Sequence, residues 1–451
     1  MQIIVVGCGK VGSTLAAQLS EEDNNVTVID TNPEVVRDIS ETYDVMGIEG
    51  NGTSYRVLQQ ADLEHTDLLI AVTESDEVNL LCCVVAKRQA DVRTIARVRN
   101  PIYSTERDFL RKELQLSMTI NPELEAAREI SRLLRFPNAI EIDSFSKERI
   151  DLLRFELPEN SLMVGKPMYE FSRQIEQNVL VCIAERGDQI IIPKGNFVPQ
   201  AGDVLTVITE PAQTEKFFRK IGIRTNRVKN VLIVGGGEIT FYLTEILLKM
   251  GIDVKIIEKN ADRCEELSDL FPQAIVDLGD GSSQDILAEE RLEDMDAFVS
   301  CTGIDEVNAI ISLYAQTKVR TKVVTKMNHI EFGDVIKNLH LDSIINPRSL
   351  TAQRILQYVR AMSNSMDSNM ETLYRLLDGR VEAMEFTINA PSRVTGIKLA
   401  DMQLKDNVLI AGIVRGGKLI ICGGQDEFKV GDSIIVLTTN VGFHDLLDIL
   451  R

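Results

Sequence analysis

The chain contains two copies of one sequence pattern, and this internal repeat limits the folds that it can adopt. Residues 3–30 read IIVVGCGKVGSTLAAQLSEEDNNVTVID, and residues 231–258 read VLIVGGGEITFYLTEILLKMGIDVKIIE. Each copy has an apolar run, a glycine-rich turn, a stretch with helical spacing and a second apolar run that ends in an acidic residue. This order predicts a strand, a phosphate-binding turn, a helix and a strand, which form half of a dinucleotide-binding fold.

The repeat continues beyond the glycine-rich turn. The segment GNGTS at 50–54 returns as GDGSS at 279–283, and AVTESDEVN at 71–79 returns as SCTGIDEVN at 300–308. The offset between the copies is nearly constant, and short loop insertions account for its small drift. Each copy is therefore a whole domain and not an isolated turn.

A second, different unit follows each copy. FELPENSLMVG at 155–165 aligns with FTINAPSRVTG at 386–396, and Gly187-Asp188 and Gly416-Gly417 are typical of hairpin turns between short strands. A helical piece is expected at Pro167–Gln174. The sequence thus predicts an α/β fold with two tandem Rossmann-like parallel-sheet domains, each followed by a small α+β module. The predicted ranges are 1–136 and 228–362 for the Rossmann-like domains and 140–225 and 371–451 for the modules.

Composition narrows the classes of partner. The net charge is −19, and affinity for nucleic acid depends mainly on cationic groups, so we expect no nucleic acid partner. No apolar stretch approaches the length of about 18 residues that a membrane-spanning helix needs. The first strand begins within three residues of Met1, which leaves no room for a signal peptide. The seven cysteines are scattered, which favours reduced thiols in a cytoplasm.

The first glycine-rich turn has the spacing of a phosphate-binding loop. Gly7 permits a tight turn, Gly9 lets the backbone approach a diphosphate, and Gly12 lets the helix pack against the strand. The following helix N-terminus offers amide N–H groups to phosphate. Asp30 ends the second strand, where it can accept hydrogen bonds from ribose hydroxyls, and it disfavours a 2′-phosphate. The alternative is a glycine turn with a packing role alone. The predicted loop contacts are Gly7, Cys8, Gly9, Lys10, Val11 and Gly12.

Three further segments follow predicted strands of the same domain. Ligands bind at the carboxyl ends of parallel strands, so Asn51-Gly52 and Thr73-Glu74 are expected to line one cleft. Arg97 ends the next strand and can hold a phosphate, but a surface salt bridge is an equally good interpretation.

The second glycine-rich turn departs from the pattern. Thr240 replaces the third glycine, Glu238 stands where the first copy has Lys10, and Glu258 replaces Asp30. We expect this half to bind nucleotide more weakly than the first half or not at all. A purely structural copy is the open alternative. Its candidate contacts are Gly235, Gly236, Gly237, Glu238, Ile239, Glu258 and Thr302.

No catalytic motif is evident. The histidines His65, His329, His340 and His444 have no evident partner in the sequence, and surface or loop positions are the simplest interpretation. No metal-ligand cluster, nucleophile elbow or Walker lysine appears either. We therefore expect no enzyme, no catalytic residue and no metal. A nicotinamide-dependent oxidoreductase and a stand-alone nucleotide sensor are the alternatives.

The combined motifs resemble the tandem RCK/KTN family. The resemblance rests on GxGxxG at Gly7–Gly12, GNGT at Gly50–Thr53, the AVTESDEVN segment and the trailing modules, and it covers essentially residues 1–451. It implies that the modules are TrkA-C domains and that the contact residues named above bind NAD(H), ATP or ADP. It also implies a regulatory subunit that gates a potassium-transporting membrane pore subunit. Such a protein assembles as a homo-oligomer, a dimer or tetramer ring, in the cytoplasm on the inner face of the plasma membrane.

The helices predicted after the sixth strand of each domain, at 122–136 and 347–362, have one apolar face. Their spacing fits two arrangements equally well. They can cross over to a partner subunit, or they can pack within the same chain.

Overall fold

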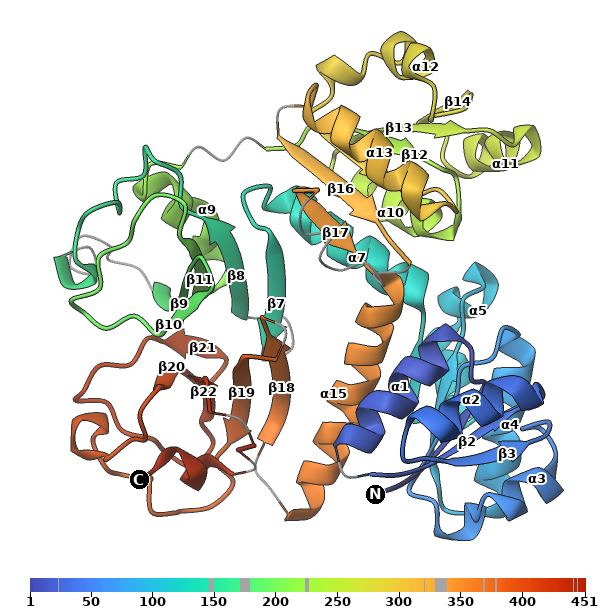
Figure 1. Ribbon diagram of the computed structural model, residues 1–451, viewed down its shortest axis with the longest axis horizontal. Helices are drawn as coiled ribbons and strands as arrows, with labels where there is room; N and C mark the ends of the chain where they lie inside the picture. Colours follow the sequence, from blue (N-terminus) through green and yellow to red (C-terminus); the bar gives the residue numbers. More distant parts are fainter. Residues whose placement is uncertain are drawn as a thin grey trace.

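The computed structural model describes residues 1–22, 24–145, 150–170, 179–223, 227–319, 321–328, 339–367, 370–377, 379–440, 442–443 and 445–451. His329, His444 and the second half of the helix predicted at Pro167–Gln174 lie outside these residues. The chain forms two parallel sheets and two antiparallel sheets in the order that the repeat predicts, so the predicted fold class is confirmed (Figure 1).

The first Rossmann-like domain has a six-stranded parallel sheet in the order β3-β2-β1-β4-β5-β6. The strands of the first sheet are β1 (Gln2–Val6), β2 (Asn25–Asp30), β3 (Met46–Glu49), β4 (Leu68–Ala71), β5 (Arg93–Arg97) and β6 (Met118–Ile120). The helices are α1 (Lys10–Glu21), α2 (Pro33–Thr42), α3 (Tyr55–Gln60), η1 (Leu63–His65), α4 (Asp76–Gln89), α5 (Pro101–Thr105), α6 (Arg107–Glu113) and α7 (Pro122–Arg135). Strand β1 is apolar throughout its buried part because helices cover both faces of the sheet: Ile3 and Val5 face one cluster, and Ile4 and Val6 face another.

The second Rossmann-like domain repeats this topology in the order β14-β13-β12-β15-β16-β17. Its strands are β12 (Asn230–Val234), β13 (Asp253–Glu258), β14 (Ile275–Leu278), β15 (Ala297–Ser300), β16 (Lys322–Lys326) and β17 (Ser343–Ile345). Its helices are α10 (Glu238–Lys249), α11 (Ala261–Leu270), α12 (Gln284–Glu289), η2 (Leu292–Asp294), α13 (Asp305–Gln316) and α15 (Pro347–Asp367). In both domains strand order reverses beside the strand that precedes the glycine-rich turn, and this is the position where open α/β sheets bind ligands.

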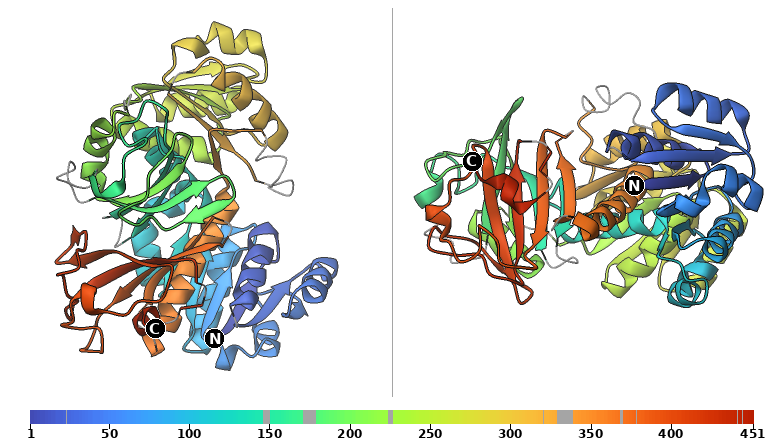
Figure 2. Two further views of the ribbon diagram at one scale, coloured as in Figure 1. Left: turned by 60° about the vertical axis from the view of Figure 1, so that its left-hand side comes forward. Right: turned by 90° about the horizontal axis from the view of Figure 1, so that it is seen from below.

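Each module contains a five-stranded antiparallel sheet. The first has β7 (Glu141–Phe145), β8 (Ile150–Glu156), β9 (Val179–Arg186), β10 (Gln189–Ile191), β11 (Val204–Thr209) and α9 (Pro211–Lys220). The second has β18 (Met370–Leu376), β19 (Val381–Thr387), η3 (Leu399–Asp401), β20 (Val408–Arg415), β21 (Lys418–Ile420), β22 (Ser433–Thr438) and η4 (Leu446–Ile449). The two sheets pack together in one apolar cluster that includes Leu152, Ile183, Val381 and Leu437 (Figure 2). Gly187 and Gly416 both have φ of +57°, as the predicted hairpins require.

Helices α7 and α15 are exchanged between the two halves. Ala352, Ile355 and Val359 of α15 share a buried cluster with Ile3 and Leu15 of the first domain. The apolar face of α7 packs in the same way against α10 of the second domain. In Figure 1 the two helices lie between the Rossmann-like domains and the modules, and they also contact each other. The apolar faces are therefore covered within the chain, so of the two predicted arrangements the structure shows packing within the chain.

The segment after α7 is fixed to the second domain by polar contacts. Lys322 of β16 is almost completely buried, and its Nζ donates to the carbonyl oxygen of Ala139 at 2.7 Å and to Asp342 Oδ1 at 2.9 Å. Ser343 Oγ donates to the carbonyl oxygen of Ile140 at 3.2 Å. Burial lowers the pKa of Lys322, and the ion pair with Asp342 opposes this effect. The first half therefore cannot move as a unit without breaking buried contacts to the second.

Candidate functional site

Two glycines of the first turn are required by the fold itself. Gly7 has φ of +93°, and a Cβ there would lie 2.7 Å from the backbone nitrogen of Thr73. A Cβ on Gly12 would lie 1.9 Å from the carbonyl oxygen of Gly7. The absence of a side chain at Gly7 and Gly12 thus lets α1 and the end of β4 pack closely against the turn, as the motif predicts.

Gly9 is different, because the fold does not require it to be glycine. Its φ is −62°, and a Cβ placed there meets no described atom within 4 Å. Gly9 is the N-cap of α1, and no side chain of the described residues caps this helix. The amide N–H groups of Lys10, Val11 and Gly12 belong to the first turn, where helices lack internal acceptors. The first turn of α1 has no acidic residue, and Lys10 adds a positive charge, so this end of the helix suits an anion.

Asp30 reaches back to the turn from the end of β2. Its Oδ2 accepts a hydrogen bond from the backbone nitrogen of Cys8 at 2.6 Å, and its Oδ1 accepts one from Asn32 at 2.9 Å. The carboxylate therefore lies beside the glycine-rich turn, at the position where ribose hydroxyls are held in nucleotide-binding folds of this type. Burial, and secondarily Asp30, raises the pKa of the Cys8 thiol to about 12. Cys8 is thus a neutral packing residue and not a nucleophile.

Asn51 and Gly52 lie beyond β3 with different roles. Asn51 Oδ1 accepts from the backbone nitrogen and the hydroxyl of Thr53, both at 2.9 Å, which fixes the turn. Gly52 is buried, and a Cβ there would lie 2.2 Å from Val6. The second copy repeats this contact between Gly281 and Val234 at 2.3 Å. The glycine is therefore needed for packing against the central strand.

Thr73 and Arg97 are joined by a residue that the sequence analysis did not single out. Asn79 of α4 is fully buried, and its Oδ1 accepts from the backbone nitrogen of Thr73 at 2.8 Å and from its hydroxyl at 2.7 Å. Its Nδ2 donates to the carbonyl oxygens of Thr73 at 3.1 Å and Arg97 at 2.9 Å. Asn308 forms the same four bonds with Thr302 and Lys326. The sequence did contain a sign that Asn79 is important, because it is the last residue of the repeated AVTESDEVN segment.

Arg97 and its neighbours place charge beside Thr73 and Glu74. Arg97 is half-buried, its Nε lacks a hydrogen-bond partner among the described residues, and burial, then the nearby Arg99, lowers its pKa. Arg99 Nη2 donates to the carbonyl oxygen of Glu74 at 2.6 Å. Asp76 Oδ2 accepts from the backbone nitrogen of Arg99 at 2.9 Å. Arg97 is therefore a cation with hydrogen-bonding capacity at the carboxyl end of β5, and among the described residues it forms no surface salt bridge of the kind considered from the sequence.

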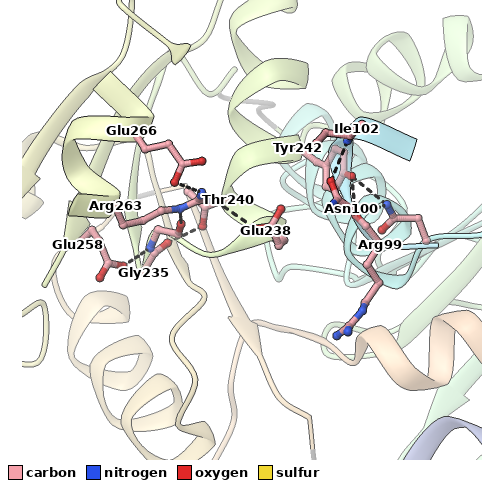
Figure 3. Close-up of polar contacts among 12 residues, drawn as sticks. Arg99, Asn100, Ile102, Gly235, Glu238, Thr240, Tyr242, Glu258, Arg263 and Glu266 are labelled. Carbon is pink, nitrogen blue, oxygen red and sulfur yellow. Dashed lines mark hydrogen bonds and ion pairs between the residues drawn. The ribbon is translucent and has the colours of Figure 1, made fainter. Parts of the chain in front are cut away.

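The second turn has the backbone shape of the first but different side chains, which Figure 3 shows. Gly235 has φ of +101°, and Glu258 Oε2 accepts from the backbone nitrogen of Gly236 at 2.5 Å. Thr240 is fully buried, and its hydroxyl donates to the carbonyl oxygen of Gly235 at 2.5 Å. The Thr side chain is thus accommodated by a hydrogen bond to the turn. Like Gly9, Gly237 is an N-cap with no described atom within 4 Å of a Cβ.

Side chains from α11 and α10 also meet at the second turn. Arg263 Nε donates to the carbonyl oxygen of Gly236 at 2.6 Å, and its Nη2 lies 3.6 Å from Glu238 Oε1. Tyr242 of α10 connects this region to the first domain, because its hydroxyl donates to the carbonyl oxygen of Arg99 at 2.9 Å and accepts from Asn121 Nδ2 at 3.0 Å (Figure 3). Ile239 is buried behind the turn, whereas Glu238 is exposed.

The described residues include neither a candidate metal site nor a helix that could span a membrane. Within those ranges no three His, Cys, Asp or Glu side chains are grouped closely enough to hold a metal ion. Likewise, no helix in the described part of the chain has the length and apolarity needed to cross a bilayer.

The fold and the glycine-turn geometry define a tandem Rossmann-like protein in which each parallel-sheet domain precedes a small antiparallel module. A family model described as the TrkA-N domain matches residues 3–122 and 231–347, and one described as the TrkA-C domain matches 152–222 and 383–451. The chain belongs to the TrkA family of Trk system potassium uptake proteins, so the resemblance seen in the sequence is confirmed.

Relatives match almost the whole length of the chain. The Trk system potassium uptake protein TrkA homolog 1 of Methanosarcina mazei is 31% identical over 446 residues, which cover 97% of each chain. The Trk system potassium uptake protein TrkA of Haemophilus influenzae is 29% identical over 443 residues, which cover 97% of this chain and 95% of that protein. The corresponding TrkA of Halomonas elongata is 31% identical over 439 residues, with the same coverage.

Solved structures share the fold. The GsuK channel bound to NAD matches with a TM-score of 0.64 at 15% identity over 97% of this chain and 76% of the channel. The GsuK RCK domain matches with a TM-score of 0.62 at 16% identity over 97% of this chain and 92% of that structure. GsuK bound to ADP matches with a TM-score of 0.51 at 13% identity over 81% of this chain and 69% of that structure.

Proposed function

We propose that the chain is a nucleotide-binding regulatory subunit of a potassium-uptake system, and that an adenine nucleotide, either NAD(H) or ADP/ATP, binds in the first Rossmann-like domain. Membership of the TrkA family supports the role in potassium uptake, and the related folds bound to NAD and ADP support the ligand class. The division into domains 1–136, 140–225, 228–362 and 371–451 remains part of this proposal.

The first domain has the groups that such a ligand needs. The diphosphate accepts hydrogen bonds from the first-turn amides of α1, with Lys10 adding positive charge. Asp30 accepts from the ribose hydroxyls and repels a 2′-phosphate, which favours NAD(H) or ADP/ATP over NADP. Thr73, Glu74 and Arg97 hold the part of the ligand that extends over β4 and β5, where Asn79 fixes the strand ends.

The observation that carries the proposal is the contrast between the glycines of one turn. Gly7 and Gly12 are glycines because a Cβ would clash with the backbone. Gly9 has no such neighbour, and it caps a helix whose first amides point outward. Packing therefore does not explain why residue 9 is glycine. Close approach of a ligand to the N-terminus of α1 does explain it.

The exchanged helices support a regulatory role. A ligand shifts an equilibrium between two conformations only by its different affinity for each of them. Here α15 packs on α1, whose N-terminus holds the proposed phosphate site, and α15 leads directly into the second module. Coupling of about 1–3 kcal/mol per site suffices for graded control in a ring of several copies. We propose that a dimer or tetramer ring of these chains binds the inner face of a potassium-transporting membrane protein.

The test is a pair of matched variants of the full chain. Gly9→Val is expected to fold with a stability loss of about 1 kcal/mol, because valine is a poorer N-cap than glycine, but to lose binding of ADP and NAD, measured by calorimetric titration. Gly237→Val places the same side chain at the equivalent open position of the second half and is expected to retain binding in the first half. Normal affinity in Gly9→Val would refute the assignment of the site.

Two further measurements test the remaining parts of the proposal. Native mass spectrometry reports the number of copies in the ring, and co-purification with a membrane pore subunit reports the partner. Incubation with NADH and candidate carbonyl substrates tests the oxidoreductase alternative, because a regulator binds the cofactor without turning it over.

A further inference from the structure

The second glycine turn carries a cation from its own domain. Arg263 lies in the first turn of α11, and its guanidinium contacts three groups: the carbonyl oxygen of Gly236 at 2.6 Å, Glu266 Oε2 at 2.7 Å and Glu238 Oε1 at 3.6 Å (Figure 3). The side chain is only 20% exposed. Glu238 is the first residue of α10, so the guanidinium bridges the turn and the start of the helix that would receive a phosphate.

The first half cannot form this bridge. The offset that aligns Asp30 with Glu258 also aligns Val35 with Arg263, and the Val35 side chain has no hydrogen-bond donor. The same offset aligns Lys10 with Glu238, and a lysine would repel a guanidinium instead of pairing with it. The two substitutions occur together, so the ion pair exists only in the second half.

The bridge changes what the second helix end offers to a ligand. The carboxylate of Glu238 offsets the positive end of the α10 dipole. In α1 no acidic side chain of the first turn does this, so the positive end remains available to a ligand. Arg263 neutralises that carboxylate and fixes the carbonyl of Gly236 with a charged hydrogen bond, which is stronger than a neutral one. An incoming diphosphate must therefore break an ion pair and move a half-buried guanidinium before it reaches the amides.

We propose that Arg263 is a specificity-determining residue that, through its contacts with Gly236 and Glu238, holds the second phosphate cradle closed against adenine nucleotides. This inference rests on the proposed function, because it takes the first cradle as the nucleotide site. It makes the two halves unequal: the first cradle binds directly, and the second binds only when Arg263 is displaced. Two identical folds in one chain then sense nucleotide at different concentrations.

Two variants of the full chain separate a closing residue from a phosphate ligand. Both carry Gly9→Val, which removes binding in the first cradle, and Glu238→Gln, which removes the carboxylate that would otherwise repel phosphate. One of them also carries Arg263→Met, which keeps the apolar stem but removes every donor. ADP is titrated into each by calorimetry. The closing role predicts that Arg263→Met tightens ADP binding at least about tenfold, since a charged hydrogen bond no longer competes. Unchanged or weaker binding would overturn the inference.

The mirror experiment does not depend on the folding of any Arg263 variant. Lys10→Glu in the first half provides the carboxylate, and Val35→Arg added to it provides the guanidinium. The inference predicts at least about tenfold weaker ADP binding in the double variant than in Lys10→Glu alone. If the added arginine strengthens binding, arginine at this position is a phosphate ligand and the inference is wrong.

The two proposals fail in different ways. If the unmodified chain binds neither ADP nor NAD, the proposed function fails whatever Arg263 does. The other case has three results: the unmodified chain binds ADP, the variant with both Gly9→Val and Gly237→Val does not, and Arg263→Met leaves the ADP affinity unchanged. In that case only the closing role of Arg263 fails.

Discussion

The two Rossmann-like domains have the same strand order and the same turn geometry, but the helices that follow their glycine-rich turns begin with residues of opposite charge. Lys10 begins α1, whereas Glu238 begins α10 and is paired with Arg263. The third glycine of the first turn is replaced by Thr240, whose hydroxyl bonds to the turn. The backbone frame of the turn is therefore the same in both copies, while the side chains beside the helix start differ between them.

This difference separates residues that maintain the fold from residues that receive a ligand. Contacts found in both halves, such as those of Gly7 and Gly235 or of Asn79 and Asn308, belong to the frame. Contacts found in one half alone, such as that of Arg263 with Glu238, are candidates for a role in ligand binding by that half. Variants made in matched pairs test this division, because a frame residue has equal effects in both halves and a ligand residue does not.

The largest effect is expected at the first glycine of each turn. Gly7→Ala places a Cβ 2.7 Å from the nitrogen of Thr73 at φ of +93°, and Gly235→Ala places one 2.8 Å from the carbonyl oxygen of Cys301 at φ of +101°. Strain and overpacking together predict a loss of about 3–5 kcal/mol in the free energy of unfolding of either domain. Thermal denaturation checks this. A much smaller loss in one half would show that its turn is free to rearrange.

The second effect concerns the buried asparagines. Asn79→Ala and Asn308→Ala each remove four hydrogen bonds and leave buried backbone groups without partners, so each is expected to lower stability by about 2–4 kcal/mol. Asn79→Ala is expected in addition to weaken nucleotide binding, because Thr73 and Arg97 lose their common support. Urea denaturation with ADP titration measures both. If Asn308→Ala weakens the first binding event equally, the halves are more tightly coupled than we propose.

The sequence predicted much of this, since repeats and glycine spacing report local backbone geometry. The strand–turn–helix order, the hairpins at Gly187 and Gly416 and the departures at Glu238 and Thr240 all follow from local patterns. The exchange of α7 and α15 could not be predicted from the sequence. An apolar face shows that a helix is covered, but it does not show which neighbour covers it. Arg263 was missed because its contact with Gly236 joins residues on different elements.

The third prediction compares the two acidic residues at the strand ends. Asp30→Ala is expected to weaken binding of ADP or NAD by about 1–2 kcal/mol, roughly tenfold, since ribose hydroxyls lose an acceptor. Glu258→Ala is expected to leave the first binding event unchanged, because its carboxylate holds the turn of the second half. Calorimetric titration of both variants gives the two affinities. Equal weakening would show that both cradles bind ligand with similar strength.

The smallest effect concerns the exchanged helices, at one of the equivalent positions where their residues differ. Helix α7 carries Glu129 where α15 carries Arg354. Burial raises the pKa of Glu129 from its usual 4.5 to about 7, with Glu141 and Asp151 acting in the same direction and Arg132 against it. The folded chain therefore binds this proton more tightly than the unfolded chain. The resulting stabilisation is complete below pH 4.5 and is lost as the pH rises through 7.

Between pH 6 and pH 8 this group is expected to lower the free energy of unfolding by about 1 kcal/mol. Burial also raises the pKa of the nearby Asp143, which gives a change of the same sign. Glu129→Gln is expected to reduce the pH dependence, measured as the difference between urea midpoints at the two pH values. Glu125→Gln is the matched control, because Glu125 pairs with Arg128 at the same spacing one turn earlier on α7. An equal reduction in both variants would assign the effect to the charge of helix α7 and not to the buried carboxylate of Glu129.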